Sequence, residues 1–250
     1  LYEQGLVEVI FKKFTKVGYI NASENWDTWN TIVNSLQIRE NPIKIAMVGK
    51  YVTLADSYVS VNEALKHASA SINSSVSIDW IDSETLNGNI KKLSEYQGIL
   101  VPGGFGTRGS EGIIEASSFA LEQNIPFLGI CFGFQLAAVS FGRSVCKLEE
   151  ANSTEVSADT KHSIIALLPE QEGVSNMGGS LRLGANEINL NKNSLAYKIY
   201  NTEVIYKRHR HRYEFNTNYR EQFEKNGMNF TAESDNGKRM EILEVPSHKF

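Results

Sequence analysis

Between residues 43 and 141, short apolar runs alternate with longer segments of helical spacing, and this alternation restricts the possible fold more than any other feature. The predicted strands are 43–49, 76–81, 97–102 and 126–130, and the predicted helices lie near 57–73, 111–123 and 132–141. Strands that alternate with helices of this length need right-handed crossovers and form a parallel sheet. The sequence therefore predicts an α/β fold with a doubly wound, mostly parallel central sheet and flanking helices on both faces.

The two ends of the chain follow other patterns. After Cys146 the strand-like runs become more frequent, around 163–168, 180–189, 203–208, 228–233 and 239–245. We expect these runs to add a small antiparallel extension to the domain. Before Asn41-Pro42, helical spacing around Leu6 and again from Trp26 predicts a linker arm with one or two helices. The predicted organisation is thus a linker at 1–41 and a domain at 42–250.

One cysteine lies where a predicted strand gives way to a predicted helix. It is the centre of Gly129-Ile130-Cys131-Phe132-Gly133, where glycines flank the turn. A sharp strand-to-helix turn brings backbone segments so close together that only glycine fits beside the central residue, whose side chain is exposed above the sheet. The N–H groups and dipole of the following helix favour a thiolate, so the pattern indicates a nucleophile with its pKa lowered from about 8.5. The alternative is a small buried cysteine that packs against the sheet.

A glycine-rich loop, Pro102 to Gly109, ends the third predicted strand and therefore lies at the same edge of the sheet as Cys131. A tetrahedral intermediate on Cys131 needs hydrogen-bond donors for its oxyanion, and the candidates are the backbone N–H groups of Phe132 and Gly104. By itself, a loop of this composition is more typical of a tight turn. No lysine followed by serine or threonine closes the loop, which disfavours a phosphate-binding loop.

Charged residues outside this edge carry weaker signals. If the segment from Arg208 to Glu214 stays extended, its three arginines share one face and its two histidines share the other. Arginine grips a carboxylate with paired hydrogen bonds, although a surface basic strand explains the same charges. Glu155 lies in a polar turn and suits an ammonium group, with a solvated loop as the alternative. For Asp56 and Ser57 we expect a helix N-cap role.

Composition excludes several classes of function. A net charge of −4 and a pI near 5.8 provide no general field for nucleic acid or an anionic membrane, so we expect neither as a partner. The only cysteines are Cys131 and Cys146, and no Cys/His spacing is typical of zinc, which favours a reducing compartment, the cytoplasm. No apolar run in the sequence is long enough to span a bilayer, and we find no signal peptide.

With these motifs in order, residues 42–250 resemble the class I glutamine amidotransferase domain of CTP synthases, a flavodoxin-like fold. The matching segments are Gly49-Lys50-Tyr51-Val52, Asp56-Ser57-Tyr58, Ser60-Val61, Glu63-Ala64-Leu65, the loop 102–109, Ala151-Asn152-Ser153-Thr154-Glu155, Met177 to Gly184, and Arg208 to Glu214. The nucleophile motif departs from the family at Phe132 and Phe134, where leucine and methionine are usual. Both apolar replacements leave the backbone donors in place. Residues 1–20 resemble the tail of a preceding synthetase domain.

The resemblance implies that glutamine is hydrolysed through a γ-glutamyl thioester on Cys131. The ammonia would pass to a synthetase domain that aminates UTP to CTP with ATP, in pyrimidine nucleotide biosynthesis. Carried over by motif, the oxyanion hole comprises Gly104 and Phe132, and the glutamine site comprises Gly104, Phe132, Gly133, Phe134, Gln135, Glu155 and Arg212. Of these, Glu155 and Arg212 match positions that hold the amino-acid end of the substrate. Phe105 and Arg108 correspond to a mobile lid linked to GTP.

The resemblance also implies what surrounds this domain. No cofactor or metal is expected in the domain itself, whereas the full-length enzyme is expected to use ATP and Mg²⁺, with GTP as an allosteric activator that is not consumed. The synthetase domain is expected in cis, in a cytoplasmic homotetramer that assembles through it. A fragment without that domain is expected to be monomeric or weakly dimeric.

The general base of the family has no counterpart among the residues given. The family uses a histidine oriented by a glutamate two residues later, and none of the five histidines, at 67, 162, 209, 211 and 248, matches that context. We expect both residues beyond position 250, the domain being truncated at its C-terminus, so these 250 residues would bind glutamine but hydrolyse it slowly or not at all. Two alternatives stay open: a glutamine-binding module that lost its base, and another amidotransferase or γ-glutamyl hydrolase on the same fold.

Overall fold

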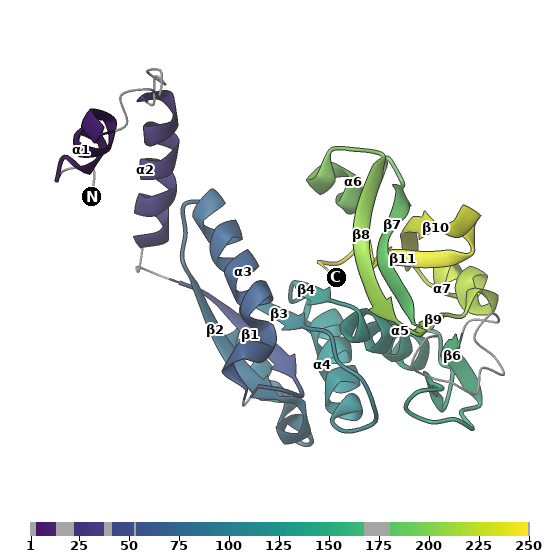
Figure 1. Ribbon diagram of the computed structural model, residues 1–250. Coiled ribbons are helices and arrows are strands. Elements are labelled where there is room, and N and C mark those ends of the chain that lie inside the picture. The colour runs from purple at the N-terminus through teal and green to yellow at the C-terminus, as the bar shows by residue number, and fades with distance from the viewer. Residues whose placement is uncertain (1–3, 14–22, 38–41, 53, 168–180, 250) are drawn as a thin grey trace.

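A computed structural model describes residues 4–13, 23–37, 42–52, 54–167 and 181–249 (Figure 1). Sheet A has four strands in the order β2-β1-β3-β4, and every neighbouring pair in it is parallel. Its strands are β1 (Ile43–Gly49), β2 (Val76–Asp82), β3 (Gly98–Val101) and β4 (Phe127–Gly129). Because β1 lies between β2 and β3, the order is the flavodoxin-like one, and the predicted parallel α/β sheet is confirmed.

Helices cover both faces of sheet A. The three that follow its strands are α3 (Val59–Ser71), α4 (Ser110–Gln123) and α5 (Phe132–Ser144). Met47 and Leu100 pack on the α3 side, whereas their neighbours Val48 and Ile99 belong to the core under α4 and α5. This alternation is what a strand with two buried faces requires, and it explains why these strands are apolar at successive residues.

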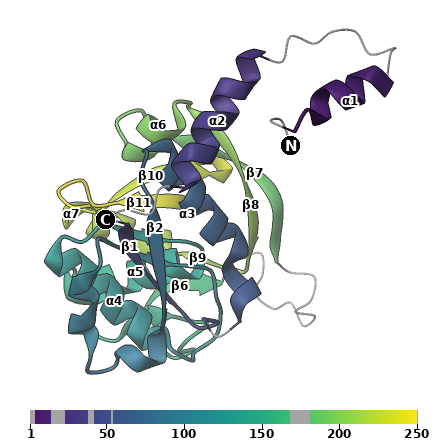
Figure 2. The same cartoon turned by 90° about the vertical axis from the view of Figure 1, so that its left-hand side faces the viewer.

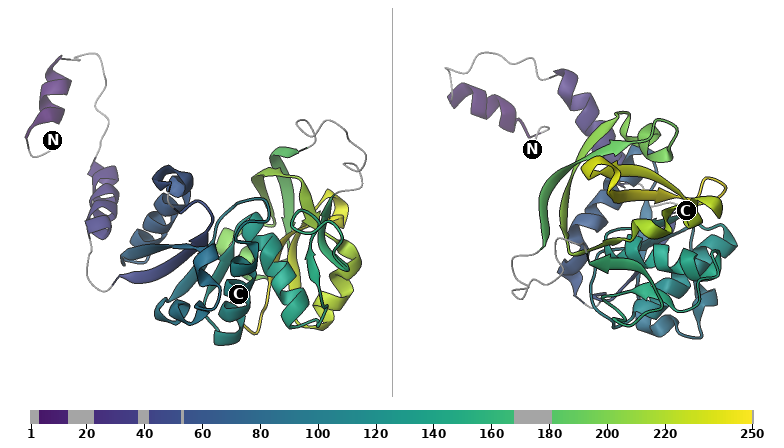
Figure 3. Two further views of the ribbon diagram at one scale, coloured as in Figure 1. Left: turned by 90° about the horizontal axis from the view of Figure 1, so that it is seen from below. Right: turned by 90° about the vertical axis from the view of Figure 1, so that its right-hand side faces the viewer.

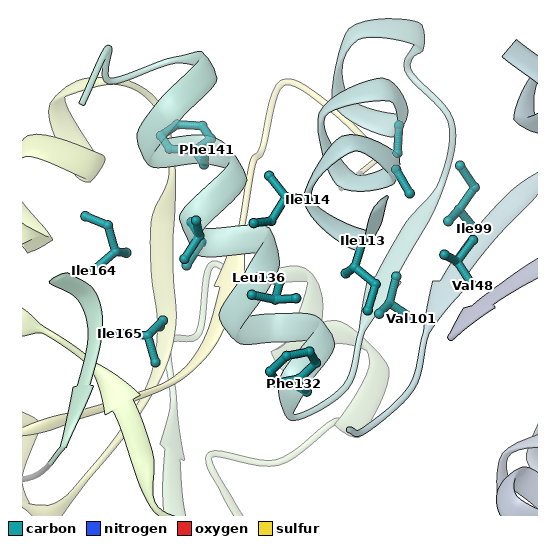
Figure 4. Packing of buried hydrophobic residues seen from close by; sticks show 14 of the residues in the cluster. Val48, Ile99, Val101, Ile113, Ile114, Phe132, Leu136, Phe141, Ile164 and Ile165 are labelled. Carbon is teal, nitrogen blue, oxygen red and sulfur yellow. The ribbon is translucent and has the colours of Figure 1, made fainter. Parts of the chain in front are cut away.

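The main core continues from sheet A into the second half of the chain (Figure 4). Phe132, Leu136 and Phe141 of α5 lie at its centre, fully buried. On one side of α5 are side chains of α4 and sheet A, and on the other are Ile164 and Ile165 of strand β6. Helix α5, which begins directly after Cys131, is therefore fixed by packing on two sides.

The second half of the chain forms two smaller sheets (Figures 1 and 3). Sheet C is antiparallel in the order β11-β10-β7-β8, with β7 (Arg182–Leu190), β8 (Val204–His211), β10 (Asn229–Ser234) and β11 (Arg239–Glu244). Sheet B has the order β5-β6-β9, with β5 (Ala151–Ser153), β6 (His162–Leu167) and β9 (Tyr213–Phe215). The predicted antiparallel extension is confirmed, while the three-residue strands β5 and β9 were not predicted.

Short helices complete the domain. They are α6 (Leu195–Tyr200), α7 (Arg220–Lys225) and the 3₁₀ turns Ala55–Tyr58, Ser83–Leu86, Ile90–Glu95, Thr217–Tyr219 and Asp235–Gly237. The N-cap prediction for Asp56 and Ser57 was wrong. The turn Ala55–Tyr58 runs straight into α3, so both residues lie inside it, and neither helix start has a side-chain cap.

Two helices precede the domain, as predicted: α1 (Leu6–Lys13) and α2 (Ser23–Gln37). Helix α2 packs against α3, and α1 lies beyond it, away from the sheets (Figures 1 and 2). The predicted boundary at 41/42 stays a prediction. Residues 177–180, part of the resemblance described above, lie outside the described residues.

The strand prediction for Arg208 to Glu214 was correct for only part of the segment. Along β8 the side chains alternate as expected, with His209 and His211 half-buried and Arg208 and Arg210 exposed. The chain then bends at Arg212 before β9 begins. The three arginines therefore do not share one face, because Arg212 is set apart from the other two by the bend and is half-buried.

Candidate active site

Cys131 occupies the sharp turn between β4 and α5. Its backbone has φ = +55° and ψ = −102°, a conformation that is strained for a residue with a side chain. The turn is closed by two backbone hydrogen bonds, from Gly133 N–H to Ile130 O and from Gln135 N–H to Cys131 O, both 3.0 Å long. A strained residue held at the N-terminus of a helix is the arrangement of a nucleophile elbow.

The two flanking glycines are required by close backbone contacts. A Cβ atom on Gly129 would lie 2.6 Å from the carbonyl carbon of Gly133. A Cβ atom on Gly133 would lie 2.3 Å from the carbonyl oxygen of Val101 in β3. Both distances are shorter than any real carbon contact, so the spacing of glycines around Cys131 follows from the packing of α5 against sheet A.

The surroundings of the Cys131 sulfur do not lower its pKa, contrary to the sequence prediction. The side chain is open to solvent on one side. The protein packed around its other side raises the pKa of the Cys131 thiol, and the carboxylates of Glu155 and Glu214 act in the same direction. The Phe132 N–H works against them by favouring the thiolate. The thiolate therefore needs a proton acceptor close by.

The glycine-rich loop lies against Cys131 and Phe132, as its position at the end of β3 predicts. A Cβ on Gly103 would lie 3.8 Å from Cys131 Cβ, and one on Gly104 would lie 3.4 Å from the Phe132 ring. The structure thus brings together the nucleophile and both residues predicted to donate to the oxyanion. Gly133 follows them in α5, where its N–H is already bonded to Ile130.

The outer part of the loop carries the predicted lid residues. The Phe105 ring is 68 % exposed and lies 5.9 Å from the ring of Tyr51, measured between centroids. The Arg108 guanidinium donates to Glu84 Oε2 and to the backbone oxygen of Lys50, at 2.8 Å each. An exposed aromatic side chain on a loop tied down at its base is compatible with a lid.

Lys50 was not singled out by the sequence as part of the site. Its side chain is only 5 % exposed, and its Nζ donates to the carbonyl oxygens of Phe105 (2.7 Å) and Gly106. Burial lowers the pKa of Lys50 to about 8, with Glu155 and Glu84 acting to raise it and Arg108 to lower it. Only its position directly after a strand, next to a glycine, indicated that it would point toward this edge.

Glu155 lies beside the glycine-rich loop. Its Oε1 accepts a hydrogen bond of 2.8 Å from the N–H of Gly106, and its own N–H donates to Ser153 Oγ at 3.2 Å. The carboxylate therefore lies close to the loop and, through its effect on the thiol, within electrostatic reach of Cys131. An ammonium group placed here would meet a negative charge that is already at the site.

Gln135 connects the nucleophile helix to the bend at Arg212. Its side chain is buried, and Nε2 donates to the carbonyl oxygen of Tyr213 at 3.0 Å. Because Arg212 directly precedes Tyr213, the bend lies beside the first turn of α5. Phe134, by contrast, is partly buried and packs against the core.

Behind the bend is a cluster of buried charges on sheets B and C, formed by Arg182, Glu214, Arg239 and Glu241 and called here the buried charge cluster. Arg182 pairs with Glu214 at 3.3 Å and with Glu241 at 2.7 Å, and Arg239 pairs with Glu214 at 3.2 Å. Burial raises the pKa of Glu214. Burial acts in the same direction on Glu241, but hydrogen bonds from Arg182 and Ser234 outweigh it and lower the pKa of Glu241.

Two histidines lie next to this cluster rather than next to the thiol. His209 Nδ1 and His211 Nε2 are 2.9 Å apart, and His211 Nδ1 is 3.2 Å from the carbonyl oxygen of Tyr213. Burial lowers the pKa of His209 to about 4, so its ring is neutral at physiological pH. Within the described part of the chain, no hydrogen bond or ion pair joins a histidine to Cys131.

Among 4–13, 23–37, 42–52, 54–167 and 181–249, no three His, Cys, Asp or Glu side chains gather as metal ligands would. No helix in these ranges is both long and apolar enough to cross a bilayer.

Comparison with known proteins supports one family. The family model for class I glutamine amidotransferases matches residues 53–250. The CTP synthase of Archaeoglobus fulgidus is 46 % identical over an alignment of 250 positions, which covers 98 % of this chain and 47 % of that protein. The CTP synthase of Halalkalibacterium halodurans is 51 % identical over 224 residues, covering 89 % of this chain and 42 % of that protein. The chain thus spans less than half the length of these curated relatives.

A solved structure resembles most of the chain. The glutaminase domain of Trypanosoma brucei CTPS, with bound acivicin, superimposes with a TM-score of 0.77. The two chains are 34 % identical, and the match covers 83 % of each. The similarity therefore extends through the parallel sheet and into the antiparallel extension.

Proposed function

The chain belongs to the class I glutamine amidotransferase family, where it matches the glutaminase domain of CTP synthases, and we propose that it hydrolyses L-glutamine at Cys131. The observation that carries this proposal is the convergence of three elements at one sheet edge. The strained turn presents Cys131, the loop brings Gly104 alongside, and α5 begins with the N–H of Phe132. A nucleophile beside two backbone donors is the arrangement that acyl transfer needs.

In the proposed reaction the Cys131 thiolate attacks the side-chain amide carbon of glutamine. The carbonyl oxygen takes the negative charge of the tetrahedral intermediate and accepts hydrogen bonds from Gly104 and Phe132. When the C–N bond breaks, the amide nitrogen takes a proton and leaves as ammonia, while the γ-glutamyl group remains on Cys131 as a thioester. Water then attacks the thioester, which releases glutamate and restores the thiol.

The amino-acid end of glutamine would be held by two opposite charges. We assign its ammonium group to Glu155, whose carboxylate already lies at the site, and its carboxylate to Arg212. The bond from Gln135 to Tyr213 supports the second assignment, because it keeps the bend with Arg212 beside the first turn of α5. Gly133 and Phe134 would contribute backbone to the pocket.

A proton acceptor is required because the protein raises the pKa of the Cys131 thiol. We propose that the histidine and glutamate of the family follow residue 250. One contact supports this: the N–H of Phe127 in β4 donates to the carbonyl oxygen of Lys249 at 3.1 Å, so the last described residues lie beside β4. Such a base contributes roughly 10²- to 10⁴-fold in rate.

The whole polypeptide would use the ammonia. We propose that it passes to a synthetase domain in cis, which aminates UTP to CTP with ATP and Mg²⁺ in a cytoplasmic homotetramer. The names and lengths of the curated relatives support this assignment. We further propose that GTP activates hydrolysis through the lid residues Phe105 and Arg108, of which Phe105 is largely exposed.

The alternative is a module that binds glutamine without hydrolysing it, and it keeps the same pocket around Cys131. To decide, the full-length polypeptide is incubated with a chloroketone analogue of glutamine, and its intact mass is measured. We expect one adduct that glutamine protects against and that Cys131→Ala abolishes. Cys146→Ala is the matched control, since Cys146 is buried and burial raises its pKa to about 11. An unlabelled wild-type protein would contradict hydrolysis and favour the binding module.

A further inference from the structure

Lys50 is a buried cation placed between the two residues that are proposed to donate to the oxyanion. Its Nζ lies 4.2 Å from the centre of the Phe132 ring, at the first residue of α5. A Cβ on Gly104 would lie 3.8 Å from Lys50 Cδ, so the aliphatic part of the side chain runs along Gly104. The Lys50 side chain therefore fills the space between the glycine-rich loop and the start of α5.

The ammonium group also holds the next two residues of the loop. It donates to the carbonyl oxygens of Phe105, at 2.7 Å, and of Gly106. Lys50 is only 5 % exposed, and burying an ammonium group costs free energy unless its N–H groups are hydrogen-bonded. The two carbonyl oxygens and the Phe132 ring offset this cost. Without the ammonium group, the carbonyl oxygens of Phe105 and Gly106 would each lose a hydrogen bond, so the loop would rearrange.

A second contact, made by the backbone amide of Gly106, holds the same part of the loop. The Gly106 N–H donates to Glu155 Oε1 at 2.8 Å. Glu155 is also the residue assigned to the ammonium group of glutamine. When glutamine binds, its ammonium group shares this carboxylate with the Gly106 N–H, whereas the Lys50 contacts use carbonyl oxygens that glutamine does not need. The Lys50 contacts therefore hold the loop in the same way before and after glutamine binds.

We propose that Lys50 is a positioning residue for the oxyanion hole: by binding the carbonyls of Phe105 and Gly106, it keeps Gly104 beside Phe132 while glutamine occupies Glu155. This inference rests on the proposed hydrolysis at Cys131. Lys50 does not touch the reacting atoms in this scheme, and its effect is transmitted through the backbone of the loop. The consequence is a defect in the chemical step rather than in glutamine binding.

The test is Lys50→Met in the full-length polypeptide, because methionine keeps most of the apolar stem and removes the ammonium group. Loss of an oxyanion donor costs roughly 10²- to 10³-fold in kcat, so we expect a fall of about 10²-fold with KM for glutamine changed less than about threefold. Lys50→Arg, which keeps the charge and the donors, should recover at least about tenfold of the loss. Lys207→Met is the matched control, since Lys207 also lies over an aromatic ring, at 4.4 Å from Tyr200, on the exposed strand β8.

Alkylation of Cys131 provides a second readout that a general loss of structure would not reproduce. The ketone oxygen of the chloroketone analogue occupies the position of the glutamine amide oxygen, so its reaction depends on the oxyanion hole. Iodoacetamide reports on the thiol without requiring the hole. In Lys50→Met we expect chloroketone labelling to slow by at least about tenfold while iodoacetamide labelling stays within about twofold of wild type.

Several results would overturn the inference. One is a Lys50→Met protein that the chloroketone labels at the wild-type rate, and another is a rise in KM with kcat unchanged. If Lys50→Met does not fold, Lys50→Gln takes its place, since its amide can donate to one carbonyl: an intermediate kcat upholds the inference and a wild-type kcat overturns it. A wild-type protein that the chloroketone does not label at Cys131 would overturn the proposed function, and with it this inference. If wild type is labelled and Lys50→Met is labelled at the same rate, only the inference about Lys50 fails.

Discussion

At the turn around Cys131 the chain is held by close contacts between backbone atoms, whereas the bend at Arg212 is backed by buried charges. Gly129 and Gly133 fix the turn because nothing larger fits between α5 and β3. The bend lies in front of Glu214, which two arginines from sheet C grip at 3.2 and 3.3 Å. The first region is specified by the absence of side chains, and the second by side chains that pair across the sheets.

This difference determines how each region responds to change. The close backbone contacts around Cys131 do not depend on pH, but they are disrupted when a substitution adds side-chain volume. A buried ionic site fails when one partner is removed, because the remaining charge stays buried without compensation. Each region therefore has a characteristic perturbation that should leave the other nearly unaffected.

The largest effect is expected from Glu241→Ala in the buried charge cluster. The Glu241 carboxylate is 5 % exposed and accepts from Arg182 at 2.7 Å. Removing it leaves the Arg182 guanidinium with a missing partner, so we expect the free energy of unfolding to fall by about 3–5 kcal/mol. Chemical denaturation measures this change.

The matched control is Glu187→Ala on strand β7 of the same sheet, where the Glu187 carboxylate accepts a hydrogen bond of 2.9 Å from the exposed Tyr206 hydroxyl. We expect a change there within about 0.5 kcal/mol. Equal effects of the two substitutions would contradict a special role for buried charge and would weaken the comparison between the two regions.

A smaller loss is expected from Gly133→Ala at the turn. The added methyl would lie 2.3 Å from Val101 O, so α5 must move away from β3, at a cost of about 1–3 kcal/mol. Denaturation gives the stability, and the labelling rate of Cys131 reports whether the turn is distorted. Gly142→Ala in the same helix is the control, because its methyl would lie 3.4 Å from Ile164 and Phe223 and alanine favours helix. If Gly133→Ala were as stable as Gly142→Ala, close packing would not explain the glycine.

The smallest expected effect depends on pH and should appear only in the ionic region. Burial lowers the pKa of His209 from 6.5 to about 4, so between these values the unfolded chain binds more protons than the folded one. Stability should therefore decrease as pH falls from 6.5 toward 4, by on the order of 1 kcal/mol from this group. Comparing His209→Asn with wild type at pH 7 and pH 5 isolates the contribution. An identical pH dependence in both proteins would show that His209 does not respond to burial as described.

The parallel sheet could be predicted from the sequence because each of its strands is marked by residues that are adjacent in the chain. Residues 45–48 of β1 are apolar at successive positions, as a strand buried on both faces requires, and the observed range of β1 is the predicted 43–49. The turn at Cys131 was predicted for the same reason, since its glycines lie within two residues of it. Strands β5 and β9 have three residues each and, unlike the equally short β4, do not lie within a longer apolar run.

The site could be predicted only in part, because some of its contacts join residues far apart in the sequence. Nothing near Arg182 in the chain indicates that Glu241 will lie 2.7 Å from it. The bend at Arg212 interrupts a segment whose residues are all compatible with a continuous strand. The raised pKa of Cys131 arises from packing and from Glu155 and Glu214, whereas local sequence showed only the favourable helix N-terminus.

The hydrogen bond between Phe127 and Lys249 has a consequence for the order in which the protein can assemble during synthesis. On the ribosome, β3, β4 and α5 emerge long before Lys249 does. Strand β4 is the last strand of sheet A, with Leu128 55 % exposed, and until then its outer side lacks the contact with Lys249. The nascent chain thus presents Cys131, the proposed nucleophile, beside a strand whose outer edge is available to chaperones or to other chains until Lys249 has been made.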